Sequence, residues 1–151
     1  MRSTLGLACA FLLLLAGAAR PQSAETPRSD ANAMRVLDEF MAAWNARDPG
    51  RLAATCNFPH VRIAGGRLTI WQTPSEFEKE HLSSVPLQRN WHYSSWDGRK
   101  VVQSSNDKVH LALSFTRYDA KGIKIATYQS LYVVTKQDGH WGVQARSSFA
   151  P

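Results

Sequence analysis

Residues 109–149 read VHLALSFTRYDAKGIKIATYQSLYVVTKQDGHWGVQARSSF. Runs rich in β-branched and aromatic residues alternate here with short segments that contain Asp and Gly. The runs are Val109–Tyr118, Ile125–Thr135 and Trp141–Phe149, and the segments between them are Asp119–Gly122 and Asp138–Gly139. Runs joined by such short turns are typical of antiparallel strands. The stretch therefore predicts a meandering antiparallel sheet in the C-terminal part of the chain.

The same pattern extends toward the N-terminus. Two shorter runs, Trp91–Trp96 and Lys100–Ser104, are each followed by a turn dipeptide, Asp97-Gly98 and Asn106-Asp107. We expect each dipeptide to end one strand and to start the next. The predicted sheet thus begins at Trp91.

A separate hairpin is predicted around Gly65-Gly66, a pair suited to a two-residue turn. Its strands are Phe58–Ile63 and Arg67–Trp71. Counting outward from the turn predicts a register in which Ile63 faces Leu68, Val61 faces Ile70, Arg62 faces Thr69 and His60 faces Trp71. Successive side chains of a strand point to opposite faces, so one face of this hairpin is apolar. The other face carries His60, Arg62 and Trp71.

Helices are predicted before and between these strands. The first, about Asp30–Arg47, has an apolar stripe at spacings of three and four residues. Trp44 belongs to this stripe, and we expect it to be buried against the sheet. Asp48-Pro49 starts a short second helix, and the capping box Thr73–Glu76 starts a third. The predicted fold is therefore α+β, with the helices packed on one face of a strongly curved antiparallel sheet.

The first 24 residues differ from the rest of the chain in composition. Arg2 is followed by an apolar run, Leu5–Leu15, and then by small residues. This order is typical of a secretory signal peptide, and the run is shorter than the roughly 20 residues that a membrane-spanning helix needs. We expect a flexible linker at 25–30 and one domain at 31–150, so the mature protein is predicted to be secreted or periplasmic and to have no stable membrane span. Cleavage is expected near Ala18, Ala19 or Ala24.

Charge and cysteine content argue against several kinds of site. The chain has 18 Lys and Arg against 12 Asp and Glu, but these charges are interspersed, so no nucleic-acid partner is expected. Loss of the signal peptide leaves Cys56 as the single cysteine, which argues against a thiolate metal site. The five His residues lack a metal-binding spacing, and no Gly-rich phosphate loop occurs. We therefore predict no metal and no cofactor.

Several stretches of the chain resemble a known group of proteins. The clearest are Ala43–Asp48, Tyr128–Val134 and Asp138–Val143, the last of which contains an Asp-Gly-x-Trp turn. On these residues the chain resembles the nuclear transport factor two-like superfamily, in its SnoaL-like and ketosteroid-isomerase-like branch. Asn57–Arg62 and Ala145–Phe149 are similar to an uncharacterised exported bacterial subgroup.

The resemblance covers about residues 30–149, essentially the whole predicted mature chain. It implies a cystatin-like cone, or α+β barrel, in which a curved sheet wraps around the N-terminal helices and leaves an apolar pocket. Members of the superfamily include isomerases, dehydratases and cyclases, and also proteins that only bind a ligand or a partner. The fold that the resemblance implies therefore fixes no chemistry.

His60 is the best single candidate for a general base, because a histidine can titrate near neutral pH. Its alternative interpretation is a hydrogen-bonded structural histidine stacked on Trp71. Counting from Gly65-Gly66 leads us to expect that His60, Arg62 and Trp71 border the main cavity. No acidic residue is clearly placed in the pocket, which argues against a ketosteroid-isomerase mechanism.

Arginines and tyrosines on the predicted strands complete the ligand-binding candidates. Arg62, Arg117 and Arg146 are able to clamp an anion such as a carboxylate. Alternatively, they form ion pairs or cover the sheet surface with their stems. Tyr128 and Tyr132 share one face of a strand and suit a pocket or a dimer contact equally well.

Three functions stay open at this point. The first is a module that binds a small hydrophobic or anionic molecule in the cone pocket. The second is a cofactor-free isomerase or lyase that uses His60 as acid or base, and the third is a protein-interaction or dimerisation domain with an occluded pocket. The expected partners are a small-molecule ligand and a second copy of the chain that pairs through the sheet. Whether the protein is an enzyme is left open.

Overall fold

The computed structural model describes residues 26–84 and 90–151, so the predicted signal peptide lies outside the described residues. The helices are α1 (Thr26–Ala46), α2 (Pro49–Ala54) and α3 (Pro74–Ser84). The strands are β1 (Cys56–Ala64), β2 (Arg67–Trp71), β3 (Tyr93–Ser104), β4 (Lys108–Tyr118), β5 (Lys124–Gln137) and β6 (His140–Ser148). Within residues 26–84 and 90–151, no helix is both long and apolar enough to cross a membrane.

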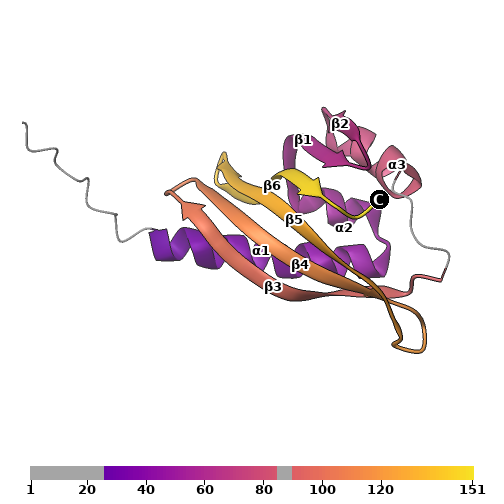
Figure 1. Cartoon of the computed structure of the whole chain (residues 1–151). Coiled ribbons are helices and arrows are strands. Elements are labelled where there is room, and N and C mark those ends of the chain that lie inside the picture. Colours follow the sequence, from indigo (N-terminus) through magenta and orange to yellow (C-terminus); the bar gives the residue numbers. More distant parts are fainter. Residues whose placement is uncertain (1–25, 85–89) are drawn as a thin grey trace, which may run out of the picture.

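The strands form one six-stranded sheet in the order β2-β1-β6-β5-β4-β3. The sheet is curved and does not close on itself, and α1 runs along one of its faces (Figure 1). Neighbouring strands are antiparallel, except that β1 and β6 are parallel. The predicted α+β fold, with N-terminal helices on a curved sheet, is therefore confirmed. The parallel pair joins the early hairpin to the last strand of the meander.

α1 is longer than predicted at its N-terminal end. It begins at Thr26, so most of the linker expected at 25–30 is helical. Ser29 and Ala33 are buried, which means that the first turns of the helix pack against the protein. The polar composition of this segment gives no local indication of a helix, and the helix forms because it packs against the rest of the protein.

The prediction of a turn at Asp97-Gly98 is wrong. β3 runs through this dipeptide, with register shifts between Trp96 and Gly98 and between Val101 and Gln103. The Asp97 carboxylate accepts a hydrogen bond from Thr116 Oγ1 of β4 at 2.7 Å. Asp97 and Gly98 favour a turn by composition, but here they form a β-bulge, and the strand continues past them.

The predicted register of the first hairpin is confirmed at every pair, from Ile63 with Leu68 to His60 with Trp71. Gly65 and Gly66 both have positive φ, at 57° and 71°, as a tight two-residue turn requires. The face that points inward is the one with His60, Arg62 and Trp71, all of which are buried. The apolar face, with Ile63 and Leu68, is exposed. Alternation alone predicts two different faces but does not decide which one covers the core.

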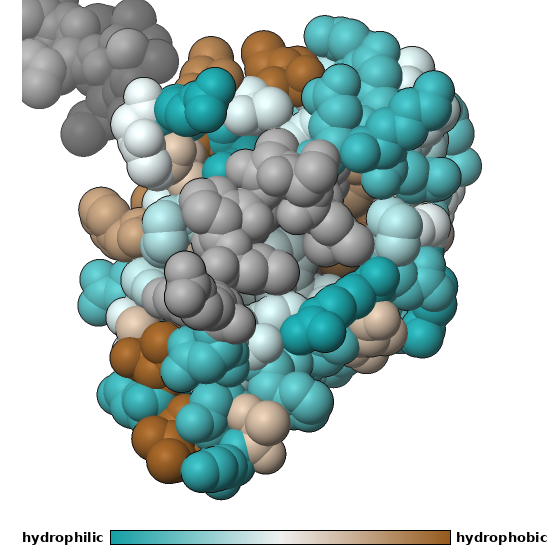
Figure 2. Space-filling model, turned by 90° about the vertical axis from the view of Figure 1, so that its right-hand side faces the viewer, coloured by the Kyte–Doolittle hydropathy of each residue, from teal (hydrophilic) through white to brown (hydrophobic). Residues whose placement is uncertain are grey.

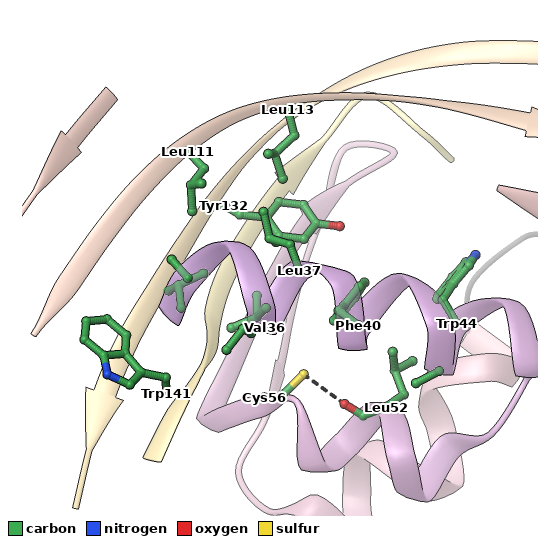
Figure 3. Close-up of a cluster of buried hydrophobic side chains, with 14 of the residues drawn as sticks. Val36, Leu37, Phe40, Trp44, Leu52, Cys56, Leu111, Leu113, Tyr132 and Trp141 are labelled. Carbon is green, nitrogen blue, oxygen red and sulfur yellow. Dashed lines mark hydrogen bonds between the residues drawn. The ribbon is translucent and has the colours of Figure 1, made fainter. Parts of the chain in front are cut away.

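The core lies between α1 and the sheet (Figure 3). Trp44 is buried, as predicted, and its ring meets that of Trp91 edge to face at 6.1 Å. Phe40, one turn earlier on α1, meets Tyr132 of β5 in the same way at 5.8 Å. The apolar stripe of α1 thus predicts the buried face of the helix correctly, because this face packs on the sheet.

Both helix starts predicted from capping residues are confirmed. Asp48 accepts a hydrogen bond from the backbone N–H of Arg51 at 2.9 Å, and Pro49 is the first residue of α2. Thr73 Oγ1 accepts from the backbone N–H of Glu76 at 3.2 Å at the start of α3. These caps satisfy N–H groups that the first turn of a helix leaves without a helical partner.

Candidate ligand-binding site

A small pocket lies between the C-terminal half of α1 and the inner face of the sheet. The space inside it that the centres of water molecules can occupy is about 30 Å³. One water needs about 10–15 Å³ on this measure, so the pocket holds a compact group rather than a large ligand. The surface at the end of the molecule where α1 finishes is mainly hydrophilic, with separate hydrophobic groups (Figure 2). The residues that line the pocket are Phe40, Met41, Trp44, Arg62, Ser94, Trp96, Phe115, Arg117, Tyr132, Arg146, Ser148 and Ala150.

Three arginines line this pocket because three strands direct them to the same face of the sheet. Arg62 of β1 is the register partner of Arg146 of β6, and Arg146 is the partner of Tyr132 of β5. Residues paired across neighbouring strands point to the same side of the sheet, so this row of side chains faces α1. Arg117 reaches the pocket from β4. The structure therefore places in one pocket the three arginines that the sequence analysis identified as separate ligand-binding candidates.

All three arginines are buried, with relative exposures of 8% for Arg62, 2% for Arg117 and 6% for Arg146. Burial, followed by the nearby charge of Arg146, lowers the pKa of Arg62 to about 10. Burial also lowers the pKa of Arg117. A guanidinium with a pKa of about 10 still carries its charge at neutral pH. Among the described residues that line the pocket there is no Asp or Glu.

Aromatic rings lie against two of these buried charges. The guanidinium carbon of Arg117 is 5.1 Å from the centre of the Tyr128 ring. That of Arg146 is 5.2 Å from the Phe40 ring and 5.9 Å from the Tyr132 ring. The negative face of an aromatic ring attracts a cation, most strongly where water is excluded. These contacts stabilise the arginines inside the protein without neutralising their charge.

His60 lies behind Arg146. Its Nδ1 is 2.8 Å from the carbonyl oxygen of Val143, and Arg146 Nε donates to its Nε2 at 3.2 Å. Because arginine only donates, Nε2 must accept, and the proton of the neutral ring is on Nδ1, which donates to Val143. Burial, followed by the charge of Arg146, lowers the pKa of His60 to about 3. His60 is therefore neutral at neutral pH, and both of its ring nitrogens are engaged.

The expectation that His60 and Trp71 border the cavity is corrected, although the same expectation holds for Arg62. His60 and Trp71 are cross-strand neighbours, as predicted, but they pack with Phe77 of α3 in a closed aromatic cluster. The rings of His60 and Phe77 are 5.3 Å apart, and those of Trp71 and Phe77 are 5.2 Å apart. α3 thus covers the inner face of the hairpin, so His60 and Trp71 belong to the core and not to the pocket wall.

The two tyrosines occupy different places. Tyr132 lines the pocket, and its side chain extends from β5 toward α1 (Figure 3). Tyr128 is half-buried beside Arg117 and Phe115 and does not reach the pocket wall. It contacts the wall residues Arg117 and Phe115, which agrees with the shared face predicted for the two tyrosines.

Sequence reasoning missed several wall residues, notably Trp96 and Ser94 of β3 and Ser148 of β6. The sequence does indicate Phe115, because it lies two residues before Arg117 in the same strand and so points to the same face of the sheet. The carboxylate of Asp38, on the polar side of α1, lies outside the pocket and forms an ion pair with Arg99. Within residues 26–84 and 90–151, no group of three or more His, Cys, Asp and Glu side chains is arranged to hold a metal ion.

Comparison with known families identifies the chain. The family described as NTF2-like protein (DUF6841) matches residues 29–148, which span all the elements from α1 to β6. The chain belongs to this NTF2-like family. No curated protein matches the chain. The resemblance to the nuclear transport factor two-like superfamily, carried by the Asp-Gly-x-Trp turn and the end of α1, is thereby confirmed.

Solved structures of NTF2-like and cystatin-like proteins share the fold. A protein of unknown function with a cystatin-like fold from Nostoc punctiforme is 11% identical, with a TM-score of 0.66 over 81% of this chain and 90% of that one. A ketosteroid isomerase-like protein from Erwinia carotovora atroseptica is 22% identical, with a TM-score of 0.59 over 80% and 96%. The protein Aln2 from a Streptomyces species is 16% identical, with a TM-score of 0.63 over 83% and 92%. At these identities the likeness concerns the fold alone.

Proposed function

We propose that this NTF2-like protein is a binding module for a small anionic molecule. The observation that carries the proposal is that Arg62, Arg117 and Arg146, all buried, line one pocket whose described wall contains no carboxylate. Three positive charges that line one pocket attract an anion, and the attraction is stronger where water is excluded. A guanidinium binds oxyanions through parallel hydrogen bonds and keeps its charge at any physiological pH.

The walls of the pocket support a small ligand with an anionic end. Phe40, Trp44, Trp96 and Phe115 give the pocket an aromatic surface that excludes water from around the arginines. Electrostatic attraction is stronger in such surroundings than in bulk water. The space of about 30 Å³ admits a charged group of a few atoms.

We propose no catalytic role for His60. An acid or base must reach the proton that it transfers, and His60 is fully buried with both ring nitrogens engaged. Its pKa of about 3 also makes it a weak base. The site thus supports binding and does not favour the isomerase or lyase alternative.

Calorimetric titration with acetate, benzoate, phosphate and sulfate at constant ionic strength tests the binding proposal. We expect saturable binding of at least one of these anions. Replacing Arg62, Arg117 or Arg146 by Gln should weaken it about tenfold or more, because each variant removes charge-assisted hydrogen bonds. Arg67→Gln, which removes an exposed arginine of β2, is the matched control and should bind like the wild type. Binding that the pocket variants leave unchanged would contradict the proposal.

We also propose that the protein is exported. Arg2, the apolar run Leu5–Leu15 and the small residues that follow support a cleaved signal peptide. Intact-mass measurement on protein from its native host should show the loss of about 18–24 residues, the usual length of such signals. A full-length chain recovered from the cytosol would contradict export.

A further inference from the structure

The arginine pocket carries an inference about the class of anion that it binds. We infer that the pocket binds a compact oxyanion with two negative charges, such as sulfate, phosphate or the headgroup of a phosphate monoester, in preference to a carboxylate. This inference rests on the proposed anion-binding function and makes it more specific.

The first reason is the charge of the wall. Arg62, Arg117 and Arg146 bring three positive charges to a pocket whose described wall carries no Asp or Glu. A single carboxylate offsets one of these charges, whereas a dianion offsets two. Because like charges repel more strongly where water is excluded, the second negative charge contributes more to binding here than at an exposed site.

The second reason is that the donors come from separate strands. The guanidinium groups come from three different strands, β1, β4 and β6. A carboxylate has two oxygens in one plane and fits one or two guanidinium groups in parallel pairs. A phosphate or sulfate group has at least three terminal oxygens that point in different directions. A tetrahedral oxyanion therefore offers a separate oxygen to an arginine from each of the three strands.

The third reason is that one of the donors is held in place by groups behind it. Arg146 Nε donates to His60, whose other nitrogen donates to the carbonyl of Val143. The guanidinium of Arg146 also lies against the rings of Phe40 and Tyr132. These contacts fix the position of the Arg146 guanidinium before any ligand arrives, which reduces the entropy lost on binding. His60 acts here as a positioning residue.

The size of the pocket agrees with this class of ligand. Space of about 30 Å³ for water centres suits a charged headgroup of a few atoms. The remainder of a phosphate monoester would then extend toward the opening of the pocket. Free phosphate and a phosphate ester therefore share the chemistry that the wall recognises, and the experiment must separate them.

The test is calorimetric titration at pH 7.5 and constant ionic strength with two matched sets of probes. Phenyl phosphate and benzoate carry the same ring and differ in the headgroup, whereas sulfate, phosphate and acetate carry no ring. We expect the three dianionic probes to bind at least about tenfold more tightly than benzoate or acetate. Phenyl phosphate that binds more tightly than phosphate would identify an ester as the ligand, and the reverse order would identify the free ion.

A pH series separates ligand charge from protein charge. The second ionisation of a phosphate monoester has a pKa of about 6, so phenyl phosphate should bind about tenfold more weakly at pH 5 than at pH 7.5. Sulfate keeps both charges over this range, and its affinity should stay constant. A sulfate affinity that changes in parallel with that of phenyl phosphate would show that a protein group titrates, and the inference would be wrong.

Substitutions separate the inference from the proposed function. Arg146→Gln should reduce the affinity for sulfate about tenfold or more, whereas Arg67→Gln should not change it. Thermal unfolding with and without sulfate shows whether each variant folds. If Arg146→Gln does not fold, Arg146→Lys takes its place, because lysine keeps the charge but lacks the planar guanidinium that binds two oxygens at once. Arginine-dependent binding in which benzoate equals phenyl phosphate would overturn the dianion and keep the proposed function. No binding of any probe would overturn both.

Discussion

At the scale of single residues, His60 has the most unusual environment. Its pKa is lowered from an ordinary value of 6.5 to about 3, chiefly by burial. The unfolded chain therefore binds one more proton than the folded protein between these two pH values. Stability rises with pH wherever the unfolded state binds more protons. The contribution of His60 is fully present above pH 6.5 and is lost as the pH falls toward 3.

We predict that the wild-type protein loses up to about 1.4 kcal/mol of unfolding free energy per pH unit from this group between about pH 6 and pH 3. Denaturant melts over this range measure the slope. His60→Gln removes the titrating ring and keeps a hydrogen-bonding group, so its slope should be smaller by this amount. Gln129→Asn, a change at an exposed residue of β5 that does not titrate, is the control and should leave the slope as in the wild type. Equal slopes for His60→Gln and the wild type would contradict the neutral, buried state of His60.

Cys56 provides a second prediction at this scale. Burial raises the pKa of its thiol to about 12, and its sulfur lies 3.5 Å from the carbonyl oxygen of Leu52 (Figure 3). The thiolate is the reactive form, so the folded protein should not react with iodoacetamide at about pH 8. Labelling should appear only in denaturant, and mass spectrometry detects it. Rapid modification of the folded protein would show that this part of the core opens.

Residue-level reasoning from sequence succeeded where a local turn set the geometry. Gly65-Gly66 fixed the pairing of His60 with Trp71 because a two-residue turn leaves one register. The contact between Arg146 and His60 could not be predicted from the sequence, because the two residues are 86 positions apart and meet only through the parallel pairing of β1 with β6. The candidate arginines were therefore identified one by one, and their common pocket was not.

At the scale of elements, α1 is held to the sheet by its aromatic residues. Trp44 is buried against Trp91, and its removal leaves a large cavity. We predict that Trp44→Ala lowers the unfolding free energy by about 3–5 kcal/mol in denaturant melts. Glu39→Ala, an exposed change on the same helix, should alter it by less than about 0.5 kcal/mol. A loss for Trp44→Ala as small as that of the control would mean that α1 does not depend on this contact.

The start of β1 and the start of β6 approach each other closely at Gly142. A Cβ atom on Gly142 would lie 2.7 Å from the carbonyl carbon of Cys56, which is backbone and cannot rotate away. We predict that Gly142→Ala destabilises the fold by about 1–3 kcal/mol, as overpacking does. Gly50→Ala, in α2, has its nearest neighbour at 3.6 Å and should stabilise the helix by about 0.5–1 kcal/mol. Thermal melts of the two variants should therefore shift in opposite directions, and shifts in the same direction would contradict this packing.

Elements with a local signal were predicted from sequence, and those that depend on distant partners were not. Asp48-Pro49 and Thr73 start helices through contacts within one turn, so their residue types suffice. Asp97-Gly98 has the composition of a turn, but Thr116 of β4 holds Asp97 within a continuous strand. A long strand with a bulge and a pair of short strands have the same local composition, so pairing with the neighbouring strand decides between them.

At the scale of the whole molecule, the face of the sheet that points away from α1 carries apolar side chains. Leu131, Ser147, Ile63 and Leu68 form one row across β5, β6, β1 and β2. Leu131 is 59% exposed, and Phe149, which follows β6, is 82% exposed. The outward face of an antiparallel sheet is usually polar, and exposed apolar side chains gathered on one face form a patch that marks a contact surface. We propose that the predicted homodimer forms through this patch.

A second copy of the chain is the partner that we expect on this patch, because a twofold contact places the same apolar residues on both sides. Leu131→Lys puts a charge at the β5 end of the row, and a twofold contact through this face would bury two such charges, so dissociation into monomers is expected. Val102→Lys makes a similar change at an exposed position of the edge strand β3 and should leave the dimer intact. Sedimentation velocity over a range of concentrations distinguishes the two variants. A wild-type protein that stays monomeric at its highest soluble concentration would contradict the homodimer, and equal dissociation by both variants would place the contact elsewhere.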